Sequence, residues 1–151
     1  MLCVGLLEGG TLRMSMRIGI VVNPDAGLGG RLGFKGSDGR AAEARAAGAE
    51  DRAGPRMLQA LEDLKTLLNG SLNRSAVELT CIGWNGRMGS TWFPKNDTKM
   101  SFESIGITPE ETSVVDTTSL VHSLVEAGAE AILYAGGDGT TRDIANALES
   151  I

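Results

Sequence analysis

The sequence contains few of the residues from which disulfide frameworks, zinc sites and membrane spans are built. Its only cysteines are Cys3 and Cys81, too few for a disulfide framework or a zinc site, which favours a reducing cytoplasm. No stretch approaches the ~20 apolar residues of a membrane-spanning helix. The formal net charge is −5 and no basic stripe offsets it, which argues against a nucleic-acid partner. We therefore expect a cytoplasmic protein whose partners are neither membranes nor nucleic acids.

Glycine, in contrast, is abundant: the chain of 151 residues contains 21 glycines, about twice the average frequency. A chain of this length fits one domain. Residues 1–16 hold a short apolar run with no preceding basic residue and no small-residue cleavage pattern, so they make a poor signal peptide. Met14 and Met16 stand just before the first convincing strand and are candidate natural start sites. We predict a disordered extension over residues 1–16 and one α/β domain over residues 17–151.

The most informative stretch lies near the end of the chain. A short apolar run at residues 131–135 reads as a buried strand, and it is followed by a glycine turn at residues 136–140 and by a helical pattern. Thr140 and Asp143 have the spacing of a helix-capping pair. Free backbone N–H groups at a helix start, beside glycines that allow close approach, predict a phosphate-sized anion site.

Asp138 stands in the middle of this turn. A carboxylate beside phosphates costs electrostatic energy unless it holds a metal or takes a proton, so Asp138 is a candidate catalytic residue and a candidate metal ligand. The alternative is structural: Asp138 and Gly139 are a common turn dipeptide, and Gly136 and Gly137 only permit tight geometry. The strand before the turn and the helix after it favour the functional interpretation.

A second glycine loop follows the strand expected at residues 17–22, a near-continuous apolar run typical of a parallel sheet. Six glycines within residues 27–39 exclude a helix interior or a packed strand. The G-x-G-x-x-G motif fails at Leu32, and the P-loop fails because no Gly-Lys-Ser/Thr occurs. What remains is a loop at the carboxyl end of a strand, where open α/β sheets bind ligands. Arg31 and Lys35 in this loop are candidate ligand contacts or solvated charges.

The rest of the chain predicts alternating helices and strands. The expected helices cover residues 41–49, residues 55–68 and a segment capped by Asp116 or Thr117 that ends at Ala127, and the expected strands cover residues 77–82, 104–107 and 114–115. Residues 94–103 are predicted to be an exposed excursion, Cys81 a buried apolar filler, and His122 solvent-exposed rather than catalytic. The alternation predicts an α/β fold with an open doubly wound parallel sheet, in which the loops at residues 23–39 and 136–140 share the carboxyl edge.

The two glycine loops also contain a recognisable set of motif residues. They are Asn23, Pro24, Ala26, Gly27, Gly29, Gly30, Gly33, Lys35, Gly36, Asp38 and Gly39 in the first loop and Gly136, Gly137, Asp138, Gly139 and Thr140 in the second. Together they resemble the ATP–NAD kinase-like family, found mainly in archaea and some bacteria, and the similar acetoin-catabolism X proteins. The wider superfamily holds NAD kinases, diacylglycerol kinases and sphingosine kinases, with 6-phosphofructokinases as distant relatives. The resemblance runs from about residue 17 to residue 151.

The resemblance implies the N-terminal domain of an NAD kinase/phosphofructokinase-like fold, with the family's second, β-rich domain absent from this chain. It further implies ATP or polyphosphate as phosphoryl donor, Mg²⁺ as cofactor, and a hydroxyl of NAD or a related small molecule as acceptor. Arg142 and Asp143 stand where the lipid kinases have Asn and Glu, which argues against a lipid substrate. The common NAD kinase pattern also differs here, so the acceptor stays open.

The resemblance assigns roles to residues of both loops. Asp138 is expected to contact the acceptor hydroxyl or the metal ion. The residues expected to bind the nucleotide are Asn23, Gly27, Gly29, Gly30, Lys35, Gly36, Gly136, Gly137, Gly139 and Thr140. The competing hypothesis is a non-catalytic nucleotide-binding module or an inactive fragment of such a kinase. We also expect apolar surface left uncovered by the absent domain to favour homo-oligomers.

Overall fold

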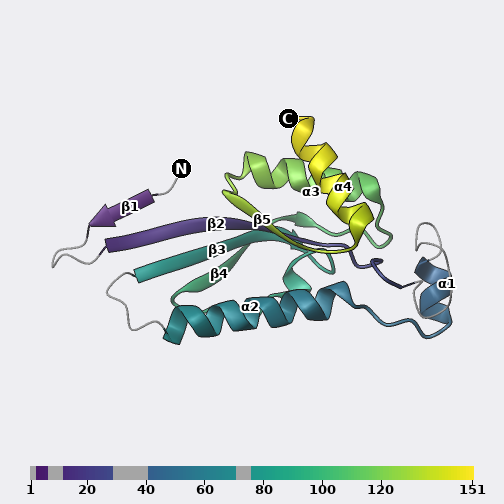
Figure 1. Cartoon of the computed structure of the whole chain (residues 1–151), viewed down its shortest axis with the longest axis horizontal. Coiled ribbons are helices and arrows are strands. Elements are labelled where there is room, and N and C mark those ends of the chain that lie inside the picture. Colours follow the sequence, from purple (N-terminus) through teal and green to yellow (C-terminus); the bar gives the residue numbers. More distant parts are fainter. Residues whose placement is uncertain (1–2, 7–11, 29–40, 71–75) are drawn as a thin grey trace.

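The computed structural model describes residues 3–6, 12–28, 41–70 and 76–151 (Figure 1). The strands are β1 (Cys3–Leu6), β2 (Leu12–Val22), β3 (Ala76–Asn85), β4 (Met100–Ile107) and β5 (Ala131–Ala135). The helices are α1 (Ala41–Ala46), α2 (Ala53–Gly70), the short 3₁₀ helix η2 (Ser90–Trp92), α3 (Val114–Glu126) and α4 (Asp138–Glu149). No helix of these described segments is long and apolar enough to cross a membrane.

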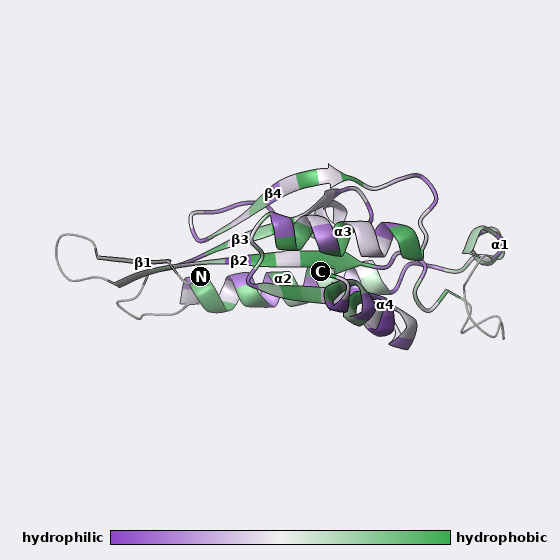
Figure 2. Ribbon diagram, turned by 90° about the horizontal axis from the view of Figure 1, so that it is seen from above, coloured by the Kyte–Doolittle hydropathy of each residue, from purple (hydrophilic) through white to green (hydrophobic). Residues whose placement is uncertain are grey.

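Four parallel strands form the sheet in the order β4-β3-β2-β5, and β1 pairs antiparallel with the first residues of β2. Helix α2 covers one face of the sheet, and helices α3 and α4 cover the other (Figures 1 and 2). This is the open, doubly wound α/β sheet that the sequence predicts, with β1 as an antiparallel addition. The connection from β3 to β4 carries only η2, so the predicted alternation lacks one helix there.

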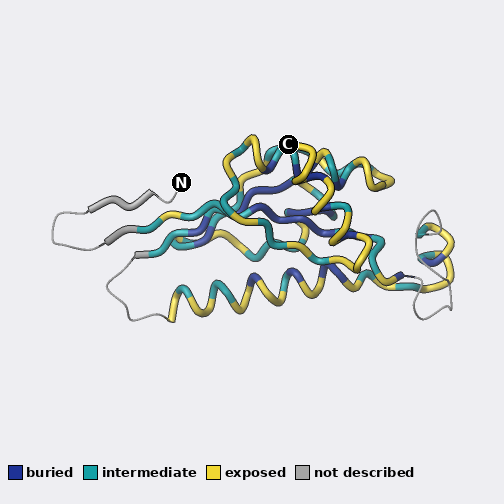
Figure 3. The backbone as a smooth tube through the Cα atoms, turned by 45° about the horizontal axis from the view of Figure 1, so that its top comes forward, coloured by how far each residue is buried: buried dark blue, intermediate teal, exposed yellow. Residues whose placement is uncertain are grey.

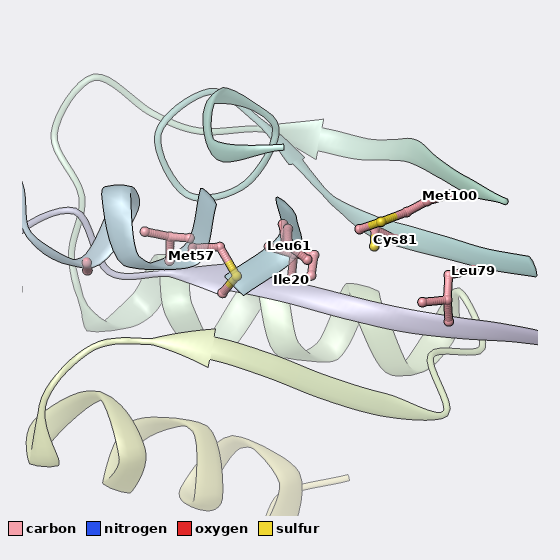
Figure 4. Packing of buried hydrophobic residues seen from close by; sticks show 8 residues of the cluster. Ile20, Met57, Leu61, Leu79, Cys81 and Met100 are labelled. Carbon is pink, nitrogen blue, oxygen red and sulfur yellow. The ribbon is translucent and has the colours of Figure 1, made fainter. Parts of the chain in front are cut away.

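The strand β2 is buried on both faces because its side chains alternate between two apolar layers. Ile20 and Val22 pack in the layer under α2, while Val21 packs in the layer under α3, and all three are fully buried. Figure 3 shows that the buried, dark blue parts of the backbone gather in the central strands of the sheet. Met57 and Leu61 of α2 complete the first layer (Figure 4). A near-continuous apolar run therefore positions the carboxyl end of β2 rigidly between two helical layers.

Cys81 lies in the layer under α2 beside Met100 and is fully buried (Figure 4). Burial disfavours the charged thiolate and raises the pKa of Cys81 to about 12. The thiol is therefore inert at neutral pH, which confirms the prediction of an apolar filler.

The amino-terminal segment differs from the predicted disordered extension over residues 1–16. Residues 3–6 form β1, and β2 begins at Leu12 rather than at residue 17. Apolar and polar residues alternate between Leu12 and Arg17, which continues the two-residue period of the strand, and this segment pairs with both β1 and β3.

The structure also corrects three expectations about where elements begin and how they are capped. The predicted excursion at residues 94–103 ends earlier, because β4 begins at the buried Met100. Residues 114–115 open helix α3 rather than forming a strand, since Ser113 precedes the helix and donates its backbone N–H to the Asp116 carboxylate at 2.8 Å. The cap is therefore Ser113 and neither of the predicted residues.

His122 is half-buried rather than solvent-exposed. Its Nε2 lies 3.2 Å from the Ala147 carbonyl oxygen and 3.0 Å from the Ser150 hydroxyl. The imidazole thus links α3 to the carboxyl end of α4, away from the glycine turn at the start of that helix, which gives it a structural role.

The order of the strands defines a topological switch point between β2 and β5. From β2 the chain moves outward to β3 and β4, and α3 then returns it to β5 on the other side of β2. The loops after β2 and β5 consequently lead to helices on opposite faces of the sheet (Figure 1). In open α/β sheets the crevice outside such a switch point is the usual ligand site.

Candidate functional site

The loops that follow β2 and β5 are joined by hydrogen bonds from Asn23. Its backbone N–H donates to the Ala135 carbonyl oxygen at 2.9 Å, and its side-chain Nδ2 donates to Thr140 Oγ1 at 2.9 Å. Its Oδ1 accepts the backbone N–H of Asp25 at 3.0 Å, which closes an Asx turn. One asparagine thus fixes both loops at the same edge of the sheet, as the sequence predicts.

Helix α4 begins three residues earlier than predicted. Gly137 is the residue before the helix, and its carbonyl oxygen accepts the Thr141 backbone N–H at 3.0 Å. Thr140 is the third helical residue and is buried, with its hydroxyl bound by Asn23. The predicted capping pair of Thr140 and Asp143 is therefore wrong, because the hydroxyl bonds across the loops instead of to the helix start.

The three glycines of the turn differ in what their missing side chains allow. A Cβ at Gly136 would lie 2.4 Å from Thr140 Oγ1, so packing inside the protein demands glycine there. At Gly137 and Gly139 a Cβ would meet nothing within 4 Å, and Gly137 has φ −103°, which any residue adopts. Glycine inside a helix costs about 1 kcal/mol relative to alanine. The described chain gives no internal reason for Gly139, whereas a ligand approaching the backbone would be one.

Two pockets flank this turn and share Ala26, Gly27 and Gly137. The first, here called the α2 pocket, has a volume of about 390 Å³. Its other lining residues come from the start of α2, from β5 and from the turn, and they are Arg52, Ala53, Arg56, Met57, Ala60, Leu133, Tyr134, Ala135 and Gly136. The second, the α4 pocket, has a volume of about 570 Å³ and is lined by Asn23, Asp25, Thr112, Ser113, Val114, Thr117, Gly139, Thr140, Arg142 and Asp143. The glycine turn is thus open on both of its sides.

The Asp25 carboxylate in the α4 pocket is already engaged by the protein. Its buried Oδ1 accepts no well-aligned hydrogen bond but lies 2.8 Å from Arg45 Nη2, and its Oδ2 accepts the Thr112 hydroxyl at 3.2 Å. Partial burial acts to lower the pKa of Arg45, but its hydrogen bonds to Asp25 and Asp51 outweigh this and raise it. The guanidinium therefore stays charged and neutralises Asp25, so this carboxylate serves the structure of the loop.

Asp138 is exposed at the first position of α4 and lines neither pocket, although Gly137 and Gly139 on either side of it do. Among the residues with described positions, its carboxylate has no hydrogen-bond or ion-pair partner. A negative charge at a helix start is stabilised by the helix dipole. Asp138 is thus a free carboxylate held beside the open backbone of the turn.

The donor set fits a magnesium ion only when phosphates complete it. In the described segments no group of three or more His, Cys, Asp or Glu side chains converges to hold a metal. Mg²⁺ is commonly bound by one or two carboxylates together with water and substrate phosphates. Asp138 can supply such a carboxylate, because no group of the described residues occupies it.

The structure brings together most of the residues that the sequence singles out. Asn23, Gly136 and Thr140 form the junction, and Gly27, Gly137 and Gly139 line the pockets beside it. The remaining predicted nucleotide-binding residues lie outside the described residues, and they are Gly29, Gly30, Lys35 and Gly36.

Five charged residues that line the pockets were not among the predicted site residues, and two of them, Asp25 and Arg142, line the α4 pocket. Arg52 and Arg56 line the α2 pocket, and Asp143 lines the α4 pocket as a half-buried carboxylate. The pattern around the arginines offered a weak signal: they stand four residues apart at a helix start that has no acidic residue in its first turn.

One family of known proteins matches this sequence over most of its length. The sequence model of the family described as the ATP-NAD kinase N-terminal domain matches residues 18–151. No curated protein and no solved structure matches the chain significantly. The matched range contains both glycine loops and every element from α1 to α4.

Proposed function

The chain belongs to the ATP-NAD kinase N-terminal domain family, and we propose that it binds a nucleotide at the β2/β5 switch point and takes part in phosphoryl transfer to a small-molecule hydroxyl. The donor in this proposal is ATP or polyphosphate, and the acceptor is NAD or a related small molecule. The observation that carries the proposal is the junction itself: Asn23 ties the two loops together and leaves the backbone of Gly137 and Gly139 open to a ligand.

The free backbone groups of the turn suit phosphate oxygens. The free N–H groups at the start of α4 form the positive end of a twelve-residue helix. Because Gly137 and Gly139 have no side chains, a phosphate can approach the backbone closely there. Positioning and electrostatic stabilisation account for most of the catalysis in phosphoryl transfer, so a rigid turn of this kind meets the main requirement.

Asp138 supplies the reactive carboxylate in this proposal. The acceptor O–H forms a new O–P bond with the terminal phosphorus of the donor, and the bond from that phosphorus to the bridging oxygen breaks with its electron pair leaving on ADP or the shortened polyphosphate. Asp138 takes the hydroxyl proton; alternatively it would hold Mg²⁺ together with the phosphates, and the hydroxyl proton would pass to a phosphate oxygen or to water. Magnesium, when bound, neutralises the charge of the phosphates. That no residue with a described position pairs with this carboxylate supports either role.

A second candidate is a nucleotide-binding module without catalysis. One observation favours it: Asp138 is exposed and lines neither pocket, so nothing among the described residues excludes water around it. Nucleotide binding and catalysis are therefore separate claims, and the same assay should measure both.

The direct test is phosphoryl transfer from labelled ATP and from polyphosphate to NAD, NADH, diacylglycerol and sphingosine. We expect transfer to NAD or NADH, a fall in turnover of roughly 10²–10⁴ for Asp138→Asn, and a far smaller change in nucleotide affinity. Asparagine keeps the turn and removes the charge. ATP binding without transfer to any acceptor supports the binding module, and transfer to a lipid but not to NAD contradicts the primary proposal.

A further inference from the structure

We infer that Arg52 and Arg56 bind the phosphate chain of the nucleotide in the α2 pocket. The inference rests on the proposed function in one respect, that the ligand is the nucleotide of that reaction. It assigns to one side of the glycine turn a phosphate subsite formed by residues outside the two glycine loops.

Both arginines lie beside the turn. They line the α2 pocket together with Gly27, Gly136 and Gly137. The stem of Arg52 passes Gly27 closely, since a Cβ built there would lie 3.6 Å from Arg52 Cδ. Two cationic side chains and the exposed glycine backbone therefore face the same space.

The two guanidinium groups have no counter-ion in the described part of the chain. Both side chains are exposed and neither has a hydrogen-bond or ion-pair partner there. The adjacent carboxylate of Asp51 is taken by Arg45 at 3.3 Å. No acidic residue occupies the first turn of α2, and none lines the α2 pocket. The pocket thus carries two uncompensated positive charges in a protein whose net charge is −5.

Their position on the helix makes the absence of an anion unfavourable. Arg52 directly precedes α2 and Arg56 lies in its first turns, at the end of the helix where the dipole is positive and repels cations. Residues four apart lie on the same side of a helix. A bound anion of two or more phosphates would relieve both the mutual repulsion of the guanidinium groups and their repulsion by the dipole.

The chemistry of the pocket fits a nucleotide phosphate chain. A guanidinium group presents a planar fork of donors that matches phosphate oxygens in pairs. The lining also includes the apolar side chains of Met57, Leu133 and Ala135, and Tyr134, whose hydroxyl lies 2.9 Å from Thr141 Oγ1. The charged end suits phosphates and the apolar part suits a planar base.

The start of α2 is held in place by the packing of Trp92 on Gly54. The Trp92 ring lies so close to Gly54 that a Cβ there would be 2.0 Å from Cε2. Trp92 Nε1 also donates to the Arg87 carbonyl oxygen at 2.8 Å. The helix turn that presents the arginines is therefore fixed against η2 before any ligand binds, which lowers the cost of ordering on binding.

The test is a calorimetric titration of the protein with ATP, NAD, inorganic tripolyphosphate and adenosine. The variants are Arg52→Gln, Arg56→Gln and the double variant, with Lys95→Gln as control, because Lys95 is exposed and lies in neither pocket. Loss of a hydrogen bond to a charged group predicts an affinity for tripolyphosphate at least about tenfold weaker for each arginine removed. Adenosine affinity should not change, and the melting temperature of the unliganded protein should stay the same or rise slightly, because each substitution removes a cation that the helix dipole repels.

The ligands separate the inference from the proposed function. A loss confined to ATP and tripolyphosphate identifies the donor as the source of the phosphates, and a loss for NAD identifies the acceptor. Arginine-dependent binding of tripolyphosphate without phosphoryl transfer keeps the inference and removes the proposed function. Unchanged ATP affinity in the double variant, with transfer intact, overturns the inference alone. Absence of all binding to the unmodified protein overturns both.

Discussion

The two pockets beside the glycine turn share Ala26, Gly27 and Gly137 but differ in nearly every other chemical respect. The α2 pocket combines two arginines with an apolar lining. The α4 pocket combines hydroxyl groups with the carboxylate of Asp143, the guanidinium of Arg142 and the Asp25 carboxylate that Arg45 already engages. The difference arises because the loops after β2 and β5 lead to opposite faces of the sheet. The α2 pocket can therefore attract anions without a competing carboxylate in its described lining, whereas the α4 pocket offers both a donor, Arg142, and acceptors to a hydroxyl-bearing ligand.

The largest effect is expected from Gly54→Ala, which disrupts the α2 pocket alone. The added Cβ overlaps the Trp92 ring, so the start of α2 must shift, at a cost of about 1–3 kcal/mol in the free energy of unfolding. Binding of tripolyphosphate should weaken as well. The matched control is Gly70→Ala at the other end of α2, where a Cβ meets nothing within 4 Å. Urea unfolding that gave the two variants equal stability would contradict the packing of Trp92 on this turn.

The glycine turn between the two pockets can be tested by two adjacent substitutions. Gly136→Ala places a Cβ against Thr140 and should lower stability by about 1–3 kcal/mol. Gly137→Val projects into open space, so it should leave the melting temperature nearly unchanged and weaken ATP binding at least about tenfold, because a branched side chain blocks close approach to the backbone. If ATP affinity is unaltered in Gly137→Val, the turn is not part of the site.

A smaller effect is expected from the hydroxyl that joins the two loops. Thr140→Val removes the acceptor of Asn23 Nδ2 and leaves that amide without its partner, at a cost of about 1–2 kcal/mol in stability. Thr118→Val is the matched control, because its hydroxyl is bonded only to the Val114 carbonyl oxygen at the exposed start of α3, and it should change stability by less than about 0.5 kcal/mol. Equal effects of the two substitutions on chemical denaturation would argue against a junction at Asn23.

The smallest effect is expected on the stability of the protein in acid. It arises from Asp97, which lines neither pocket. Hydrogen bonds from Asn69 and from the Lys99 and Met100 backbone, with the charge of Lys65, lower the pKa of Asp97 to about 2. The carboxylate therefore stabilises the fold fully above its ordinary pKa, and this contribution is lost as the pH falls through about 2. Melting temperatures of the protein and of Asp97→Asn should converge between pH 4 and pH 2. A gap that stays constant with pH would show that the charge of Asp97 contributes nothing.

The sequence predicts the sheet and the main features of the site because local patterns determine them. The buried run that ends at Val22 is a local signal, and the structure confirms it. The partner of Thr140 is Asn23, 117 residues away, so spacing alone led to the wrong cap. Val114 and Val115 resemble a strand because they are β-branched, but the Ser113 cap starts a helix there. Arg52 and Arg56 look like solvated charges until the fold places them beside the turn.

The central claim is that a nucleotide approaches the open backbone at the β2/β5 switch point, and amide chemical shifts test it most directly. Titration of isotope-labelled protein with ATP should shift the N–H signals of Gly137 and Gly139 strongly. The signals of Gly70 and Gly128, which lie at the far ends of α2 and α3, should stay in place. Shifts at Gly70 or Gly128 with none at Gly137 and Gly139, under conditions in which ATP binds, would contradict the assignment of the site.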